Sequence, residues 1–193
     1  MASNRQRTPS KGTPESKAEV LANVCAELST SGVDAAAETL RANYPFVAES
    51  RVTRRYTERQ CLRVFFGDGF IDRYSGTQLV NPAVLRTLSV IFPEAFPAHP
   101  NWKMSDTHFA FWELFPTIDH LIPVSRGGVD DETNWVTASM LRNSAKAHWT
   151  LDELGWQLFA AGDLNDWDGL SSWLVEYTSG HRDLLMDKGL VHE

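Results

Sequence analysis

The sequence predicts an α+β fold in which a mainly helical chain encloses a two-stranded hairpin backed by a helix. Two β-prone runs, 114–122 and 135–137, flank a turn cluster, and a segment rich in helix formers, 138–148, follows them. Helices are also predicted where Ser or Thr stands three positions before Glu or Gln, the spacing of a capping box. Such pairs are Ser16 with Glu19, Thr57 with Gln60, and Thr150 with Glu153, the last starting a helix over 151–161.

Four segments follow one another along the chain. Residues 1–15 are predicted to be a disordered tail, because they hold basic side chains, two prolines and few apolar residues. Residues 16–56 form an N-terminal helical region, whose second helix is expected to start at Asp34. Residues 57–150 form the domain that carries the hairpin, and 151–193 a C-terminal helical extension packed on that domain.

The composition excludes several classes of protein. With 193 residues, of which 42% are hydrophobic and 22% charged, the chain resembles an ordinary globular protein. It has no run of about 18 apolar residues, and its first fifteen residues lack the apolar centre of a secretory signal. We therefore expect a cytoplasmic protein with no membrane partner. Only Cys25 and Cys61 are present, too few for a four-cysteine zinc site.

One ordered set of residues carries the functional signal. It consists of Asp119-His120-x-x-Pro123, then Gly127-Gly128, then Asn134 fourteen positions after the histidine, then Asn143-x-x-Lys146. These residues fall on the predicted strand, loop, strand and helix in turn. In this the chain resembles the HNH nucleases, the family with the ββα-metal fold; the resemblance covers about residues 61–150 and is strongest in 117–146. It implies that 57–150 is an HNH nuclease domain.

The resemblance implies a metal-dependent endonuclease that hydrolyses DNA phosphodiester bonds. Asp119 and Asn143 would hold one Mg²⁺ or Mn²⁺, since carboxylate and amide oxygens suit these hard cations. His120, an imidazole that can exchange a proton near neutral pH, would be the general base. By the same analogy Asn134 holds the loop and the histidine ring in register, and Lys146 reaches a phosphate.

Geometry sets one condition on this assignment. Adjacent side chains of a strand point to opposite faces, so Asp119 and His120 serve one site only if the strand bends. We expect such a bend next to Pro123.

The charge limits how the chain would hold DNA. The net charge of −7 opposes a polyanion, and the imbalance lies in residues 61–193, with nine basic and eighteen acidic side chains. Binding would then depend on a few local contacts, and on a protein partner, a delivered substrate or a restricted target. The residues predicted to contact nucleic acid are Arg54, Arg55, Arg126, Arg142 and His148, although a solvated basic face also explains the cluster around Arg54 and Arg55.

The chain departs from many HNH domains in lacking two Cys-x-x-Cys pairs that bind a structural zinc. The corresponding stretches are 72–76 and 139–143, which contain no cysteine. We therefore expect no structural zinc, and expect aromatic packing and an ion pair between Asp72 and Arg142 to replace it.

Other interpretations remain open at this stage. Asp119 and His120 could form a simple ion pair, Asn134 could be a turn residue, and Lys146 could lie on a solvent-facing helix surface. The alternative function is a catalytically silent HNH-like module that binds nucleic acid or a protein partner. An acidic protein-binding domain that merely resembles the motif is a third interpretation.

Overall fold

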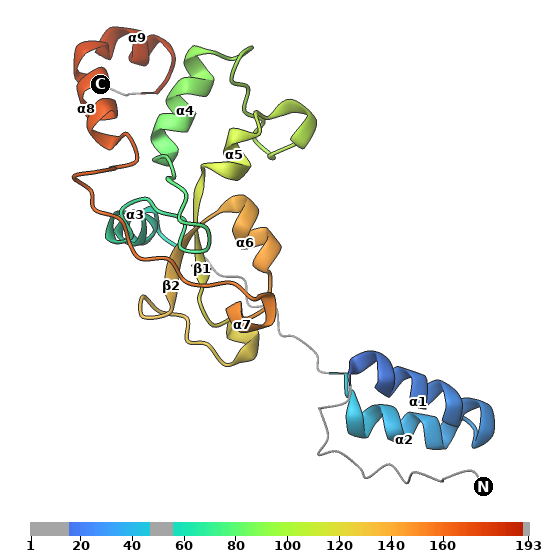
Figure 1. Cartoon of the computed structure of the whole chain (residues 1–193). Helices are drawn as coiled ribbons and strands as arrows, with labels where there is room; N and C mark the ends of the chain where they lie inside the picture. Colours follow the sequence, from blue (N-terminus) through green and yellow to red (C-terminus); the bar gives the residue numbers. More distant parts are fainter. Residues whose placement is uncertain (1–15, 47–55, 191–193) are drawn as a thin grey trace, which may run out of the picture. The chain divides into compact units, whose positions relative to one another are not determined.

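The computed structural model describes residues 16–46 and 56–190, and the chain divides into two compact units, Met1–Arg51 and Val52–Glu193 (Figure 1). Residues 1–15, 47–55 and 191–193 lie outside the described residues, so the predicted tail and the candidate contacts Arg54 and Arg55 do too. Within the described ranges, no helix has both the length and the apolar character needed to cross a membrane.

The first unit contributes a pair of helices, α1 (Lys17–Thr30) and α2 (Val33–Asn43). The predicted capping box is present, with the Ser16 hydroxyl accepting from the Glu19 amide and the Glu19 carboxylate accepting from the Ser16 amide. Gly32 joins the helices at φ 89°, a backbone conformation that favours glycine. Within the two helices, only Val20 and Ala36 are buried.

The second unit is α+β. Its sheet consists of β1 (Pro116–His120) and β2 (Trp135–Ser139), paired antiparallel with Pro116 opposite Ser139 and His120 opposite Trp135. The remaining elements are helical: α3 (Glu58–Gly67), α4 (Pro82–Ile91), η1 (Met104–Asp106), α5 (Ala110–Glu113), η2 (Val124–Arg126), α6 (Met140–Lys146), α7 (Leu151–Leu154), α8 (Ser171–Gly180) and α9 (Arg182–Asp187).

The hairpin is packed between helices. Helix α3 contacts both strands, and α6, which follows β2 directly, also contacts both (Figure 1). Phe65 of α3 packs with Phe70, Leu79 and Ile118 in one buried cluster. Successive side chains of a strand point to opposite faces. Ile118 therefore packs on the α3 side of β1, whereas Thr117 and Asp119 point to the other side of the sheet.

The C-terminal part differs from the prediction after its first turn. Helix α7 begins at the predicted capping box but ends at Gly155, which has a left-handed φ of 64°. The chain then runs extended beside the loop that follows α3: the Phe159 amide donates to the Arg73 carbonyl at 2.8 Å, and the Gly162 amide to the Asp68 carbonyl at 3.0 Å. Glycine is required here, because a Cβ at Gly69 would lie 2.4 Å from the Gly162 carbonyl oxygen.

The expected ion pair between Asp72 and Arg142 is wrong. Asp72 is 1% exposed, and its two carboxylate oxygens accept from the backbone amides of Tyr74 at 2.8 Å and Ser139 at 2.9 Å. Arg142 instead lies over the Trp156 ring at 5.4 Å. A single carboxylate thus joins the 72–76 turn to the start of α6.

Removing this carboxylate should destabilise the protein. We expect Asp72→Ala to lower the free energy of unfolding by about 3 kcal/mol, because two buried amides lose a charged acceptor. Urea denaturation followed by circular dichroism measures the loss. The exposed Asp187 at the end of α9 provides a control, and Asp187→Ala should change stability by less than about 0.5 kcal/mol. Equal effects of the two substitutions would contradict the linking role of Asp72.

Candidate functional site

The motif residues gather at the end of β1 and along the helix that follows the hairpin. Asp119 pairs with Val136 and His120 with Trp135, so the strand stays regular through both residues. The expected bend next to Pro123 comes too late to bring them to one face, since η2 starts only at Val124. Asp119 and His120 therefore face opposite sides of the sheet, and each has its own set of partners.

On one side, Asp119 lies in a buried polar cluster. Its Oδ2 accepts from the Lys146 ammonium at 2.9 Å and from the Tyr74 hydroxyl at 2.7 Å. Burial, followed by the charge of the nearby Asp119 carboxylate, raises the pKa of Tyr74 well above its ordinary value. The Tyr74 hydroxyl consequently stays protonated and acts as a donor to Asp119.

Lys146 has a different position from the one predicted. Its side chain is completely buried, and its ammonium also donates to the His120 carbonyl at 2.7 Å. The Tyr74 ring lies 5.5 Å from the same nitrogen. Lys146 therefore cannot reach a phosphate in this conformation; it ties α6 to Asp119 and to the backbone of the next residue, His120. The alternative of a solvent-facing lysine is also wrong.

Asn143, one turn earlier on α6, is fixed by the same face of β1. Its Nδ2 donates to Thr117 Oγ1 at 2.9 Å and to the Ile118 carbonyl at 3.1 Å. The Thr117 hydroxyl itself donates to the Ala138 carbonyl at 2.9 Å, so it can only accept from Asn143. These bonds set the orientation of the amide, and the Asn143 carbonyl oxygen is left without a hydrogen bond to the described residues.

On the other side of the sheet, His120 is 5% exposed and is held by a carboxylate that the sequence did not single out. Its Nε2 lies 2.7 Å from Asp130 Oδ1. The Trp135 indole N–H lies 3.2 Å from both that oxygen and His120 Nε2, and the Tyr56 ring centre lies 6.4 Å from that of His120. In the tautomer with the proton on Nε2, that nitrogen and the Trp135 indole both donate to Asp130, and Nδ1 keeps its lone pair; in the other tautomer Nε2 accepts from Trp135. Nδ1 makes no hydrogen bond to any residue within 16–46 or 56–190.

Asn134 closes the loop between the strands. Its Oδ1 accepts from the Ile122 amide at 2.9 Å, and its Nδ2 donates to the carbonyls of Ile122 and Val129, both at 2.8 Å. Gly128 is required beside it, because a Cβ there would lie 1.9 Å from the Ile122 carbonyl oxygen. Asn134 thus holds the backbone of the loop, whereas the His120 ring is held by Asp130.

The described candidates for nucleic-acid contact each have a partner within the protein. Arg126 lies 3.4 Å from the Glu153 carboxylate, and Arg142 covers the Trp156 ring. His148 stacks on Trp149 with ring centres 5.1 Å apart. These contacts lie at or near the surface, where an ion pair or ring contact contributes little free energy. A phosphate can therefore displace the present partner of each side chain at modest cost.

Three residues at the site were not predicted: Tyr74, Thr117 and Asp130. Tyr74 and Asp119 are 45 positions apart, a separation that no local pattern connects. Asp130 stands in the acidic run 130–132, where nothing distinguishes it from its neighbours. Its closeness to His120 depends on the loop that Asn134 closes and on the Trp135 indole, which donates to the same carboxylate.

The described part of the chain holds no group of three or more His, Cys, Asp or Glu side chains that could bind a metal ion. Comparisons with protein-family models, with curated proteins and with solved structures found no match to this chain.

Proposed function

We propose that this protein is a metal-dependent endonuclease of the HNH type that hydrolyses DNA phosphodiester bonds. The observation that carries the proposal is the position of Lys146, whose ammonium bonds both the Asp119 carboxylate and the His120 carbonyl. One buried contact thereby fixes the helix bearing Asn143 against the two adjacent residues that the resemblance assigns to metal binding and to proton transfer.

His120 has the chemistry of a general base. In the tautomer whose Nε2 proton is directed to Asp130, the imidazole offers Nδ1 as the acceptor for a proton from water. Asp130 stabilises the cation that forms when the proton is taken up, and it fixes the ring while the proton moves. Asp130 is a positioning residue, since it acts through His120.

The oxygens needed for a hard divalent cation are present in this donor set. Lys146 and Tyr74 both bond Oδ2 of Asp119, and Asn143 bonds β1 only through Nδ2, so Oδ1 of each side chain makes no hydrogen bond to the described residues. Two such oxygens suit Mg²⁺ or Mn²⁺, which retain several waters in proteins. When bound, the cation would supply Lewis-acid stabilisation of the charge that develops on the phosphate.

A specific observation also favours the alternative, a catalytically silent module that binds nucleic acid or a protein partner. Asp119 and His120 face opposite sides of the sheet, and His120 is nearly buried beside Tyr56. A module that had lost activity would tolerate such an arrangement. An active enzyme needs the His120 ring to reach the same phosphate as the cation.

Incubating the purified protein with supercoiled plasmid separates these functions. The proposal expects nicked circles with Mg²⁺ or Mn²⁺ and none with a chelator. Retention of plasmid on the protein without nicking under any divalent cation would favour the silent module. Absence of both nicking and binding would contradict both the nuclease and the silent nucleic-acid-binding module.

We expect the binding of DNA to be weak and only mildly dependent on salt. The acidic excess of residues 61–193 leaves few phosphate contacts, and the slope of log affinity against log salt counts those contacts. Affinity for a duplex, measured by fluorescence anisotropy in chelator across a salt series, gives this slope. Tight binding with a slope reporting about six or more phosphates would contradict the expectation.

A further inference from the structure

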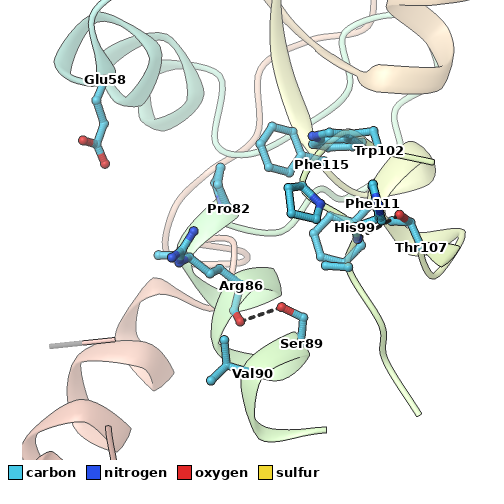
Figure 2. A pocket seen from close by; sticks show the side chains of 13 residues that line it. Glu58, Pro82, Arg86, Ser89, Val90, His99, Trp102, Thr107, Phe111 and Phe115 are labelled. Carbon is cyan, nitrogen blue, oxygen red and sulfur yellow. Dashed lines mark hydrogen bonds between the residues drawn. The ribbon is translucent and has the colours of Figure 1, made fainter. Parts of the chain in front are cut away.

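A cavity of about 540 Å³ lies between α4 and the aromatic segment that precedes β1 (Figure 2). We call it the aromatic pocket and define it by the side chains of Arg86, His99, Trp102, Phe111 and Phe115. Its volume is in the range of cavities that bind small molecules and cofactors. None of these residues belongs to the site at the end of β1.

The apolar wall of the pocket consists of aromatic rings packed against one another. The Trp102 ring meets those of Phe111, Trp112 and Phe115 edge to face, at centre distances of 5.6, 5.9 and 4.8 Å. Trp102 also has a φ of 52°, which bulky residues rarely adopt, and its amide donates to the His99 carbonyl at 2.9 Å. Strain of this kind persists where the surroundings fix it, and it is concentrated at functional sites.

Two polar side chains of the pocket, His99 and Arg86, offer donors. His99 Nδ1 accepts from the Asn101 amide at 3.1 Å, which puts the proton of the neutral ring on Nε2. The exposed Arg86 guanidinium makes no ion pair with any described acidic side chain. The one acidic side chain in the lining, Glu58, stands on the side away from His99 and Phe111 in Figure 2. The pocket thus offers flat aromatic surfaces beside an unpaired cation.

This pocket continues towards the proposed active site. A second cavity of about 520 Å³ shares Glu58, Pro82, Ala83 and Phe115 with it and extends along β1 to Thr117, Ile118 and Tyr56. The Tyr56 ring is the one that lies 6.4 Å from His120. The two cavities adjoin at these shared residues, so an extended ligand can pass from the neighbourhood of His120, beside the Glu58 carboxylate, to Arg86 and His99.

We propose that the aromatic pocket binds an unpaired base of the nucleic-acid substrate, with Arg86 contacting the adjacent phosphate. The inference rests on the proposed function, which supplies the nucleic acid. Aromatic side chains stack on every base, and a neighbouring arginine tracks the backbone, the combination used to hold single strands. The Nε2 proton of His99 adds a donor for a carbonyl oxygen or ring nitrogen of the base.

Binding of labelled single strands by the full chain in chelator tests this. The probes are a short thymidine oligonucleotide and an abasic strand of equal length and charge, compared by fluorescence anisotropy. We expect the thymidine strand to bind about fivefold or more tightly, as base stacking predicts. Trp102→Leu and Phe115→Leu should abolish this preference, and Arg86→Gln should weaken both strands equally. Arg182→Gln, which removes an exposed arginine of α9, should change neither.

Equal affinity of the wild-type protein for the two strands would overturn the inference, as would a preference that survives in both aromatic variants. Equal affinity for the two strands is the result expected if the pocket holds an apolar protein segment instead. If the aromatic variants fail to fold, as judged by circular dichroism, His99→Ala replaces them and must reduce the preference. Cleavage is scored separately: a base preference in a protein that never nicks plasmid would uphold the pocket and contradict the nuclease.

Discussion

Replacing His120 with alanine should reduce metal-dependent nicking of plasmid about 100-fold or more. A positioned general base contributes a factor of this order, and no other described histidine lies in the cluster around β1. The rate of loss of supercoiled plasmid under single-turnover conditions measures the effect. Binding of DNA in chelator should remain within about twofold of wild type, because His120 is 5% exposed and contributes little surface to a ligand.

The same assay distinguishes the role of Asp130 from that of its neighbours. Asp130→Asn should lower the cleavage rate about tenfold, since a neutral amide stabilises the protonated imidazole less than a carboxylate does. Asp131→Asn is the matched control, because the Asp131 carboxylate accepts from Thr133 and not from His120. Cleavage by His120→Ala at the wild-type rate would show that another residue takes the proton.

Local signals predicted where elements begin, and they succeeded because capping depends on residues three positions apart. The boxes at Ser16, Thr57 and Thr150 are all present. The predicted end of the helix over 151–161 was wrong: Gly155 ends α7, and the segment that follows forms backbone hydrogen bonds with Asp68 and Arg73. Those partners are more than 80 positions away, beyond the reach of any local pattern.

The sequence predicted which residues form the candidate site, but not which hydrogen bonds and ion pairs they make. The spacing of Asp119, Asn143 and Lys146 identified residues that the fold does bring to one face of β1. Helical spacing could place Lys146 on the face of Asn143, yet it could not decide whether that face is exposed. The partners of Asp72 were not predictable either, since it bonds the backbone amides of Tyr74 and Ser139. Almost every residue carries a backbone amide, so no residue type in the sequence marks such a partner.

The burial of Lys146 predicts the largest effect on stability. Lys146→Met keeps the volume of the side chain but leaves the Asp119 carboxylate in a buried cluster without its cation. Removing one partner of a buried pair costs about 3–5 kcal/mol, because the remaining charge keeps its desolvation penalty. We therefore expect the free energy of unfolding in urea to fall by about that amount. Adding Asp119→Asn to the same protein should recover part of the loss, since the double variant has no unpaired charge.

An exposed pair of the same chemistry provides the control. Lys103 lies 2.7 Å from the Asp106 carboxylate, and the two side chains are 62% and 45% exposed. Lys103→Met should cost less than about 1 kcal/mol, because water screens the pair and solvates the acid that remains. If Lys146→Met were no more destabilising than Lys103→Met, the ammonium of Lys146 would not be the contact that holds α6 against β1. The same comparison separates structure from chemistry at this site: a Lys146→Met protein that stays folded but no longer nicks plasmid would indicate that the position of Asp119, and not stability alone, depends on this lysine.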